Sequence, residues 1–129
     1  MDGGSILVVE DEPLILMDIE AALEEAGFAV TGMTSSESAL TAFSAEPDTF
    51  KALVTDIRLG PGKSGWELAR EIRAKKPALP IVYISGDSAE HWPSEGVPNS
   101  LMISKPFFMP QITTALASLL NDQQPGDNA

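Results

Sequence analysis

Carboxylate, hydroxyl and ammonium side chains follow four short apolar runs of this chain. Glu10 and Asp11 come after Ile6–Val9, Asp56 ends Lys51–Asp56, Ser85 ends Leu79–Ser85, and Lys105 comes after Ser100–Ser104. Apolar, β-branched runs that stop at Gly, Pro or acidic residues are typical of buried strands. Because ligands of parallel α/β sheets bind at the carboxyl ends of the strands, we expect these side chains to meet at one sheet edge.

Three of these side chains are carboxylates, and their convergence would need compensation. Glu10, Asp11 and Asp56 would repel one another and raise one another's pKa unless a divalent cation offset their charge. Oxygen ligands without histidine or cysteine favour a hard ion, Mg²⁺ or alternatively Mn²⁺. We expect Asp11, Asp56 and one backbone carbonyl after Asp56 to bind this ion, while Glu10 holds a water molecule bound to it.

Ser85 and Lys105 would complete a site for a phosphoryl group. A hydroxyl and an ammonium can orient and neutralise phosphoryl oxygens, and Asp56 could be the carboxylate nucleophile that becomes an aspartyl phosphate. Singly, each residue has a simpler interpretation: Glu10 and Asp11 could cap a helix, Ser85 could belong to a turn, and Lys105 could be a solvated charge. Their shared position at strand ends favours one common site.

The segments between these strands have helical periodicity. Helices are expected after Pro13, Ser64 and Pro110, and a further strand over Phe28–Gly32 precedes another helix. Thr34–Glu37 and Ser64–Glu67 have the spacing of capping boxes.

The segment from Asp87 to Pro98 is the weakest element. It holds two prolines, a glycine and few apolar residues, so we expect at most one or two helical turns, ending before Pro93. Five strands alternating with four regular helices and one poor one predict a single α/β layer structure, with a parallel sheet and right-handed crossovers.

Length and composition restrict the function. The 129 residues are 43% hydrophobic, which suits one domain, predicted at residues 1–121 with a polar tail at 122–129. The absence of cysteine excludes disulfides and thiolate metal sites. No segment approaches the roughly 20 apolar residues of a membrane span, so we expect a cytoplasmic protein without membrane contact. A net charge of −11 opposes binding to nucleic acid.

The pattern resembles the receiver domain of two-component response regulators, of the CheY-like type. The matching residues are Val8–Glu12, Val54–Asp56, Ile84–Gly86 and Ser104–Phe107, within a resemblance that covers residues 5 to about 121. The resemblance implies a flavodoxin-like (βα)5 fold with a doubly wound, five-stranded parallel sheet. From the sequence we expect its fourth helix to be short or irregular.

The resemblance also implies the roles of the candidate residues. Asp56 would accept a phosphoryl group from a histidine kinase or a histidine phosphotransfer protein, with Mg²⁺ held by Glu10, Asp11 and Asp56. Ser85 and Lys105 would bind the phosphoryl oxygens, and the Lys105–Pro106 bond would be cis. Apart from this transfer and slow autodephosphorylation, no enzymatic activity is expected. Output would be protein–protein interaction with an unknown partner or a homodimer.

Three features depart from the family pattern. Met102 stands where the family usually has an aromatic switch residue, so Trp92 or His91 is our hypothesis for the missing aromatic contact. The loop with Gly60, Pro61 and Gly62 is one residue longer than the common pattern, which would shift Arg58 and the backbone carbonyl expected to face the metal. The weak fourth helix would leave a mobile or irregular output surface.

Other functions are compatible with parts of the pattern. An aspartyl-nucleophile phosphohydrolase would want an acid two residues after the nucleophile, where this chain has Arg58. A flavin-binding electron carrier would need a phosphate cradle where this chain has Glu10–Pro13, which would repel phosphate. The chain could also be a receiver fragment of a larger hybrid kinase or regulator.

Overall fold

The computed structural model describes residues 4–87 and 89–122 and contains one five-stranded sheet in this part of the chain. Its strands are β1 (Ser5–Val9), β2 (Ala29–Met33), β3 (Phe50–Asp56), β4 (Ile81–Ser85) and β5 (Ser100–Ser104). All neighbours pair in parallel, in the order β2-β1-β3-β4-β5. The order reverses beside β1, so the sheet is doubly wound and the predicted flavodoxin-like fold is confirmed.

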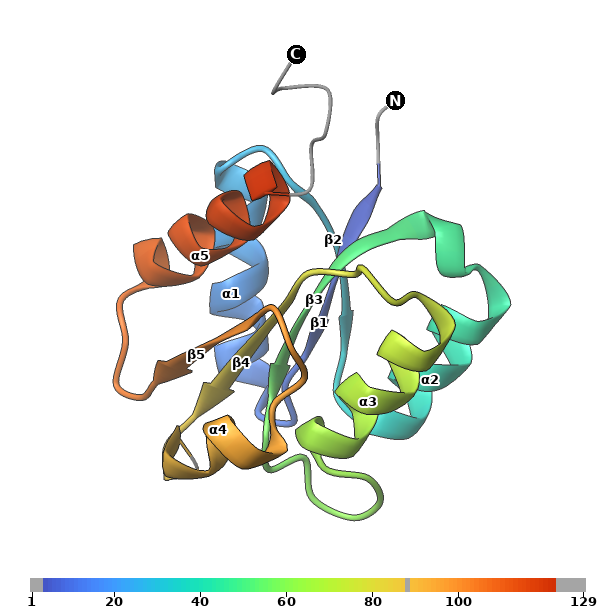
Figure 1. The fold of residues 1–129 in the computed structure, drawn as a ribbon. Helices are drawn as coiled ribbons and strands as arrows, with labels where there is room; N and C mark the ends of the chain where they lie inside the picture. The colour runs from blue at the N-terminus through green and yellow to red at the C-terminus, as the bar shows by residue number, and fades with distance from the viewer. Residues whose placement is uncertain (1–3, 88, 123–129) are drawn as a thin grey trace.

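Helices cover both faces of the sheet (Figure 1). The regular ones are α1 (Pro13–Glu25), α2 (Ser36–Ala45), α3 (Gly65–Lys75) and α5 (Met109–Asp122), with short pieces at η1 (Pro47–Thr49), η2 (Ala89–His91) and α4 (Trp92–Glu95). Helices α1 and α5 lie on one face, and α2 and α3 on the other. Of the predicted tail, Asp122 ends α5, whereas residues 123–129 lie outside the described residues.

Alternation of side chains along the strands builds a separate core on each face. Ile6, Val8, Val54, Val82 and Ile84 pack with residues of α1 and α5. Their sequence neighbours point the other way and pack against α2 and α3, with Phe43, Trp66, Leu68, Ile72 and Tyr83 in this second cluster. Because β1, β3 and β4 are buried on both faces, their sequences are nearly continuous apolar runs with polar residues at the carboxyl ends.

The two predicted capping boxes have different outcomes. Ser64 caps α3 as expected: its hydroxyl accepts from the Glu67 N–H at 3.2 Å and its N–H donates to Glu67 Oε1 at 2.9 Å. The prediction that Thr34 caps α2 is wrong. Ser35 is the cap, because it keeps the extended backbone and accepts from the Ser38 N–H at 3.1 Å.

The fourth helix is short, as predicted, but its predicted position is wrong. We expected helical turns to end before Pro93, yet α4 contains this proline in its first turn, where its missing N–H is not needed. The end of α4 and the segment after it are held by hydrogen bonds from α3. Arg70 donates to the Glu95 carbonyl at 3.0 Å, and Arg73 donates to the Asn99 carbonyl at 3.1 Å.

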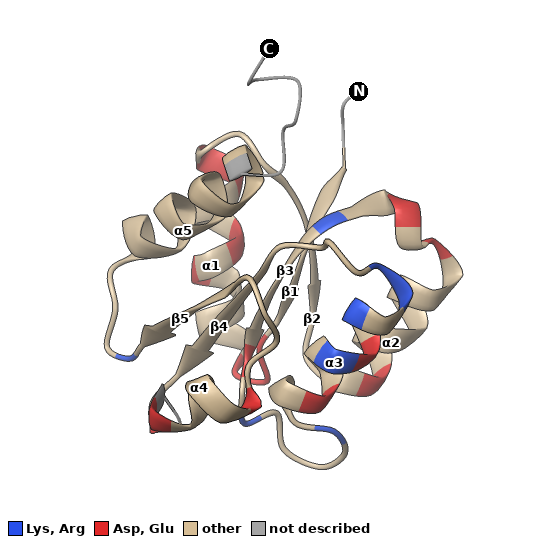
Figure 2. Cartoon of the chain, viewed as in Figure 1, with Lys and Arg blue, Asp and Glu red and all other residues tan. Residues whose placement is uncertain are grey.

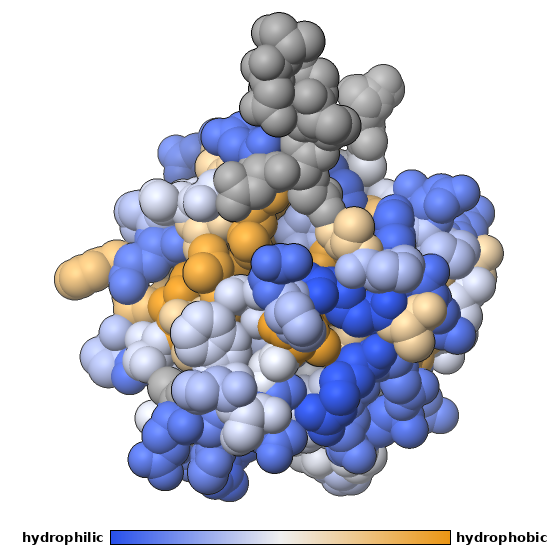
Figure 3. All heavy atoms as spheres, viewed as in Figure 1, coloured by the Kyte–Doolittle hydropathy of each residue, from blue (hydrophilic) through white to orange (hydrophobic). Residues whose placement is uncertain are grey.

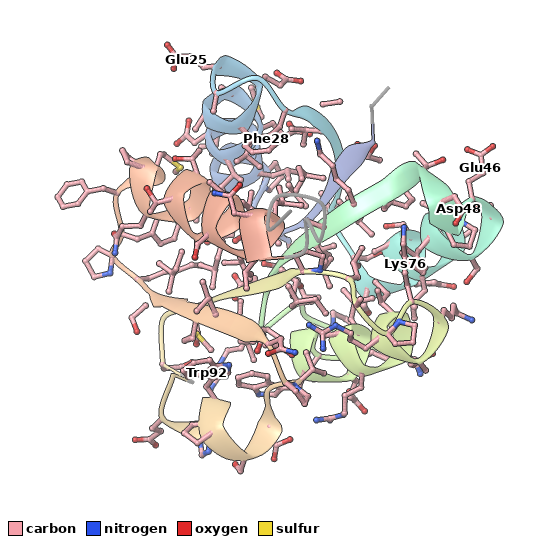
Figure 4. All side chains as sticks on the ribbon, turned by 45° about the horizontal axis from the view of Figure 1, so that its top comes forward. Glu25, Phe28, Glu46, Asp48, Lys76 and Trp92 are labelled. Carbon is pink, nitrogen blue, oxygen red and sulfur yellow. The ribbon has the colours of Figure 1, made fainter. Side chains whose placement is uncertain are left out.

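Buried hydrogen bonds hold the same segment to the sheet. The Val97 N–H donates to the Tyr83 hydroxyl at 3.1 Å, and the Ser100 hydroxyl donates to the Val97 carbonyl at 2.6 Å. Trp92 Nε1 donates to Ser100 Oγ at 3.0 Å, and Figure 4 shows this indole between α4 and β5. The surface is therefore irregular, as expected, but tied to α3 and β4 at several points.

Within the described residues, no helix is both long and apolar enough to cross a membrane.

Candidate functional site

Three carboxylates meet at the carboxyl ends of β1 and β3. These strands pair directly, with Val9 beside Thr55, so Glu10 and Asp11 leave the sheet next to Asp56. One carboxylate oxygen from each residue lies within 4.8 Å of the others. Glu10 is 1% exposed and Asp56 6%, whereas Asp11 is exposed. The predicted convergence is confirmed, and Figure 2 shows it as red segments below β1 and β3.

Lys105 brings a positive charge to this cluster. Its Nζ lies 2.9 Å from Asp56 Oδ2, to which it donates a hydrogen bond, and 3.6 Å from Glu10 Oε1. The Lys105 N–H donates to the Ser85 carbonyl at 2.7 Å, which ties this residue to the end of β4. The Lys105–Pro106 bond is cis, as predicted.

Ser85 lies at the same edge, at the end of β4. Its neighbour Ile84 pairs with Asp56, and the Ser85 side chain is buried, with its hydroxyl accepting from the Asp87 N–H at 3.2 Å. In front of these residues is an open cavity of about 490 Å³, lined by Asp11, Glu12, Asp56, Arg58, Asp87 and Lys105. The carboxylate of Asp56 and the ammonium of Lys105 thus line one opening, and the Ser85 hydroxyl lies at the same sheet edge.

The negative charge of the cluster exceeds the positive charge that Lys105 supplies. Among the described residues, Glu10 Oε1 has no hydrogen-bond partner although it is buried. Burial raises the pKa of Glu10 from 4.5 to about 7; a hydrogen bond from the Glu12 N–H opposes this change and the charge of Asp56 adds to it. Burial alone would lower the pKa of Lys105, but the hydrogen bond and charge of Asp56 outweigh it and raise this pKa.

A divalent cation fits this arrangement. An orphaned buried carboxylate oxygen and three clustered acids supply hard oxygen ligands and an excess of negative charge. This is the donor set expected from the sequence for Glu10, Asp11 and Asp56.

The loop after β3 places Arg58 at the cavity. That this loop is one residue longer than the family pattern stays a prediction. The backbone N–H of Arg58 donates to Asp56 Oδ1 at 3.3 Å. Gly60 and Gly62 in this loop have positive φ values of 77° and 98°, which glycine adopts without strain. Gly65 has no room for a side chain, because a Cβ there would lie 2.2 Å from the Asp56 carbonyl oxygen. That the backbone carbonyl of Arg58 binds the metal stays a prediction.

Sequence reasoning missed the partner of the Arg58 side chain. The guanidinium pairs with the Asp87 carboxylate, with Nε to Oδ1 at 3.0 Å and Nη2 to Oδ2 at 2.8 Å. The two residues lie 29 positions apart. No spacing rule links them, and only the adjacency of β3 and β4 brings their loops together.

Two candidate switch residues, Met102 and Trp92, lie on the α3 side of the sheet. Met102 is half-buried and pairs with Tyr83 across β4 and β5, and Trp92 packs against the same cluster. His91 is exposed and lies 3.7 Å from Glu90. Sequence reasoning also missed Tyr83, a fully buried aromatic residue next to Met102 that lies 4.7 Å from the Trp66 ring.

Comparisons with known proteins show what this chain is similar to. A model of the response regulator receiver domain matches residues 6–117. The chain is 33% identical to the receiver protein CpdR of Brucella abortus, covering 89% of this chain and 95% of CpdR. A receiver protein structure from Sinorhizobium medicae has 41% identity and a TM-score of 0.89, covering 93% of this chain and 96% of that one.

A further relative is longer. The regulator PhyR of Methylorubrum extorquens is 29% identical over 92% of this chain, which spans 44% of the length of PhyR.

Proposed function

The chain belongs to the family of response regulator receiver domains, and from this premise we propose that it is a phosphorylation switch whose acceptor is Asp56. One observation carries the proposal. Asp56 is held by Lys105 at 2.9 Å, in a cluster with Glu10 and Asp11, at the sheet edge where this fold binds ligands.

The proposed reaction is phosphoryl transfer to a carboxylate. An oxygen of Asp56 attacks the phosphorus, an O–P bond forms, and the bond to the donor's leaving group, a histidine nitrogen, breaks. Lys105 neutralises one phosphoryl oxygen, and the Ser85 hydroxyl donates to another. Hydrolysis returns the Asp56 carboxylate and inorganic phosphate. We propose no reaction on a separate substrate.

Glu10, Asp11, Asp56 and the Arg58 carbonyl are the proposed holders of Mg²⁺, for which Mn²⁺ could substitute. When bound, the ion would neutralise charge on the transferring phosphoryl group. The residues alone already orient the acceptor, since Lys105 and the Arg58 N–H fix the two oxygens of Asp56.

The donor is proposed to be a histidine kinase or a histidine phosphotransfer protein. Leu14 and Met17, one turn apart at the start of α1, are 77% and 60% exposed directly after the acidic cluster. Exposed apolar residues beside the acceptor are suited to contact with a partner protein. The net charge of −11 favours protein partners over nucleic acid or anionic membrane, which fits a cytoplasmic location.

Output is proposed to pass through the surface around β5, to an unidentified protein or a second copy. A cavity of about 550 Å³ lies there between β5 and α5, lined by Leu101, Met102, Ile103 and Ala115 among others. Figure 3 shows hydrophobic residues gathered over this region. Ser85, Lys105, Met102 and Trp92 are the proposed route by which phosphorylation would bias it.

Intact mass spectrometry after incubation with acetyl phosphate and Mg²⁺ tests the proposal. We expect a gain of one phosphoryl group that is absent in Asp56→Asn and in a chelated sample. A folded protein that gains no mass from acetyl phosphate or from a phosphorylated histidine kinase would contradict it.

The chain can also be a receiver part of a larger hybrid kinase or regulator, because it spans less than half of PhyR. The same reaction at Asp56 would then control a neighbouring domain. An aspartyl-nucleophile phosphohydrolase is disfavoured by Arg58, which occupies the position that such an enzyme would use for its acid.

A further inference from the structure

An ion pair spans the cavity in front of Asp56. The Arg58 guanidinium grips both oxygens of Asp87, at 3.0 and 2.8 Å, and both residues line this cavity. The pair joins the loop after β3 to the loop after β4. It therefore connects the segment that carries the acceptor with the segment that leads to η2 and α4.

Both members of the pair are attached to the reacting groups through their backbones. The Arg58 N–H donates to Asp56 Oδ1 at 3.3 Å, and the Asp87 N–H donates to Ser85 Oγ at 3.2 Å. A phosphoryl group on Asp56 that draws in the Ser85 hydroxyl would disturb both attachments. Phosphorylation of Asp56 would therefore change the positions of both Arg58 and Asp87.

The pair itself is weak. The side chains of Arg58 and Asp87 are 76% and 54% exposed, and solvent screening leaves an exposed ion pair with little effect on stability. A phosphoryl group adds about −1.5 to −2 charges to a cavity that Asp87 also lines. It would repel Asp87 and offer Arg58 a better bidentate acceptor.

We propose that Arg58 exchanges partners on phosphorylation: its guanidinium releases the Asp87 carboxylate and binds the phosphoryl oxygens on Asp56. This assignment rests on the proposed function of Asp56. Arg58 is then a phosphoryl-binding residue, and Asp87 is the competitor that holds it in the unphosphorylated state. The exchange releases the β4–α4 connection from the β3 loop, so one side chain couples the acceptor to the surface near α4.

Binding of beryllofluoride with Mg²⁺, a stable mimic of the phosphoryl group, tests the exchange at equilibrium. The affinity is measured by ¹⁹F NMR for the wild type, Arg58→Gln, Asp87→Asn and the double variant. We expect Arg58→Gln to weaken binding about tenfold. Asp87→Asn should tighten it about two- to fivefold, because Arg58 no longer has to leave a partner.

The double variant separates an exchange from a general effect of charge. In the exchange, Asp87→Asn has no effect once Arg58 is Gln, since the competition has ended. Equal effects of Asp87→Asn in both backgrounds would overturn the proposal, as would a tightening by Arg58→Gln. Arg58→Lys keeps the charge but loses the bidentate geometry. Its affinity for beryllofluoride should lie between those of the wild type and Arg58→Gln.

Lys63 and Glu71 provide the matched control. They form another exposed pair, at 2.9 Å, with side chains 46% and 44% exposed, and neither lines the cavity at Asp56. Lys63→Gln and Glu71→Gln should leave beryllofluoride affinity within about twofold of the wild type. A wild type that binds no beryllofluoride and gains no phosphoryl group would overturn the proposed function itself. Wild-type binding without the non-additive pattern would overturn only the exchange.

Discussion

Two polar regions of this protein differ in how many of their buried groups have hydrogen-bond partners. The acidic cluster joins Glu10, Asp11 and Asp56 and leaves Glu10 Oε1 without a hydrogen-bond partner among the described residues. The β4–β5 network, which we define as Tyr83, Trp92, Val97 and Ser100, places a donor opposite an acceptor at each of its three bonds.

This is the difference expected between groups that bind a ligand or react and groups that stabilise the fold. Buried charges that repel one another cost stability, and they persist where a ligand or a reaction uses them. Complete hydrogen bonding instead stabilises one arrangement of the backbone. Neutralising a buried acid of the cluster should therefore raise the free energy of unfolding, whereas removing a hydrogen-bond partner from the β4–β5 network should lower it.

Lys105→Met should have the largest effect. It removes the only ammonium beside Asp56 in the described structure, so the unphosphorylated, metal-free protein should lose about 2–4 kcal/mol of stability. Phosphorylation by acetyl phosphate should slow about 100-fold. Chemical denaturation with and without Mg²⁺ is the measurement. Mg²⁺ should restore much of the lost stability, and an equal loss with and without the ion would count against a charge-balancing role.

Glu10→Gln should change the free energy of unfolding in the opposite direction. The raised pKa of Glu10, about 7 against 4.5 for an ordinary glutamate, means that the folded protein binds a proton more tightly than the unfolded chain. Stability from Glu10 is then fully present below pH 4.5 and lost as the pH rises through about 7. At pH 8, without metal, Glu10→Gln should stabilise the protein by about 1–3 kcal/mol.

Unfolding curves between pH 4 and 8 check this prediction. The decline of wild-type stability over this range should be smaller in Glu10→Gln, and adding Mg²⁺ should reduce the decline in the wild type. A Glu10→Gln variant that is less stable than the wild type at pH 8 would remove the contrast between the two regions. Glu37, an exposed acid on α2, provides the control as Glu37→Gln.

The sequence predicted the acidic cluster better than the β4–β5 network, for a physical reason. Parallel strands buried on both faces confine polar residues to strand ends, so Glu10, Asp56 and Lys105 could be found without coordinates. The partners of Tyr83 and Arg58 depend on which loops the strand order brings together. Those contacts span 14 and 29 residues and carry no periodic signal.

Tyr83→Phe tests the satisfied region. The ring stays buried beside Trp66, but the Val97 N–H loses its acceptor, which should cost about 1–2 kcal/mol. Burial raises the pKa of Tyr83, so the hydroxyl stays neutral and the loss should not depend on pH between 5 and 8. Denaturation at both pH values measures this, and restoration of stability by Mg²⁺ would contradict the separation of the two regions.

Trp92→Phe should have the smallest effect and probes how α4 is held. Phenylalanine keeps an aromatic ring against the cluster that also contacts Met102 but cannot donate to Ser100 Oγ, so we expect a loss of about 0.5–1 kcal/mol. Ser100→Ala also removes the bond to the Val97 carbonyl, but in a double-mutant cycle the combined loss should be smaller than the sum, because both variants remove the Trp92–Ser100 bond. Additive losses would mean that Trp92 acts through packing alone. A changed Mg²⁺ affinity in Trp92→Phe would show instead that this network reports on the acidic cluster, which is the behaviour expected of the aromatic contact that Met102 cannot supply.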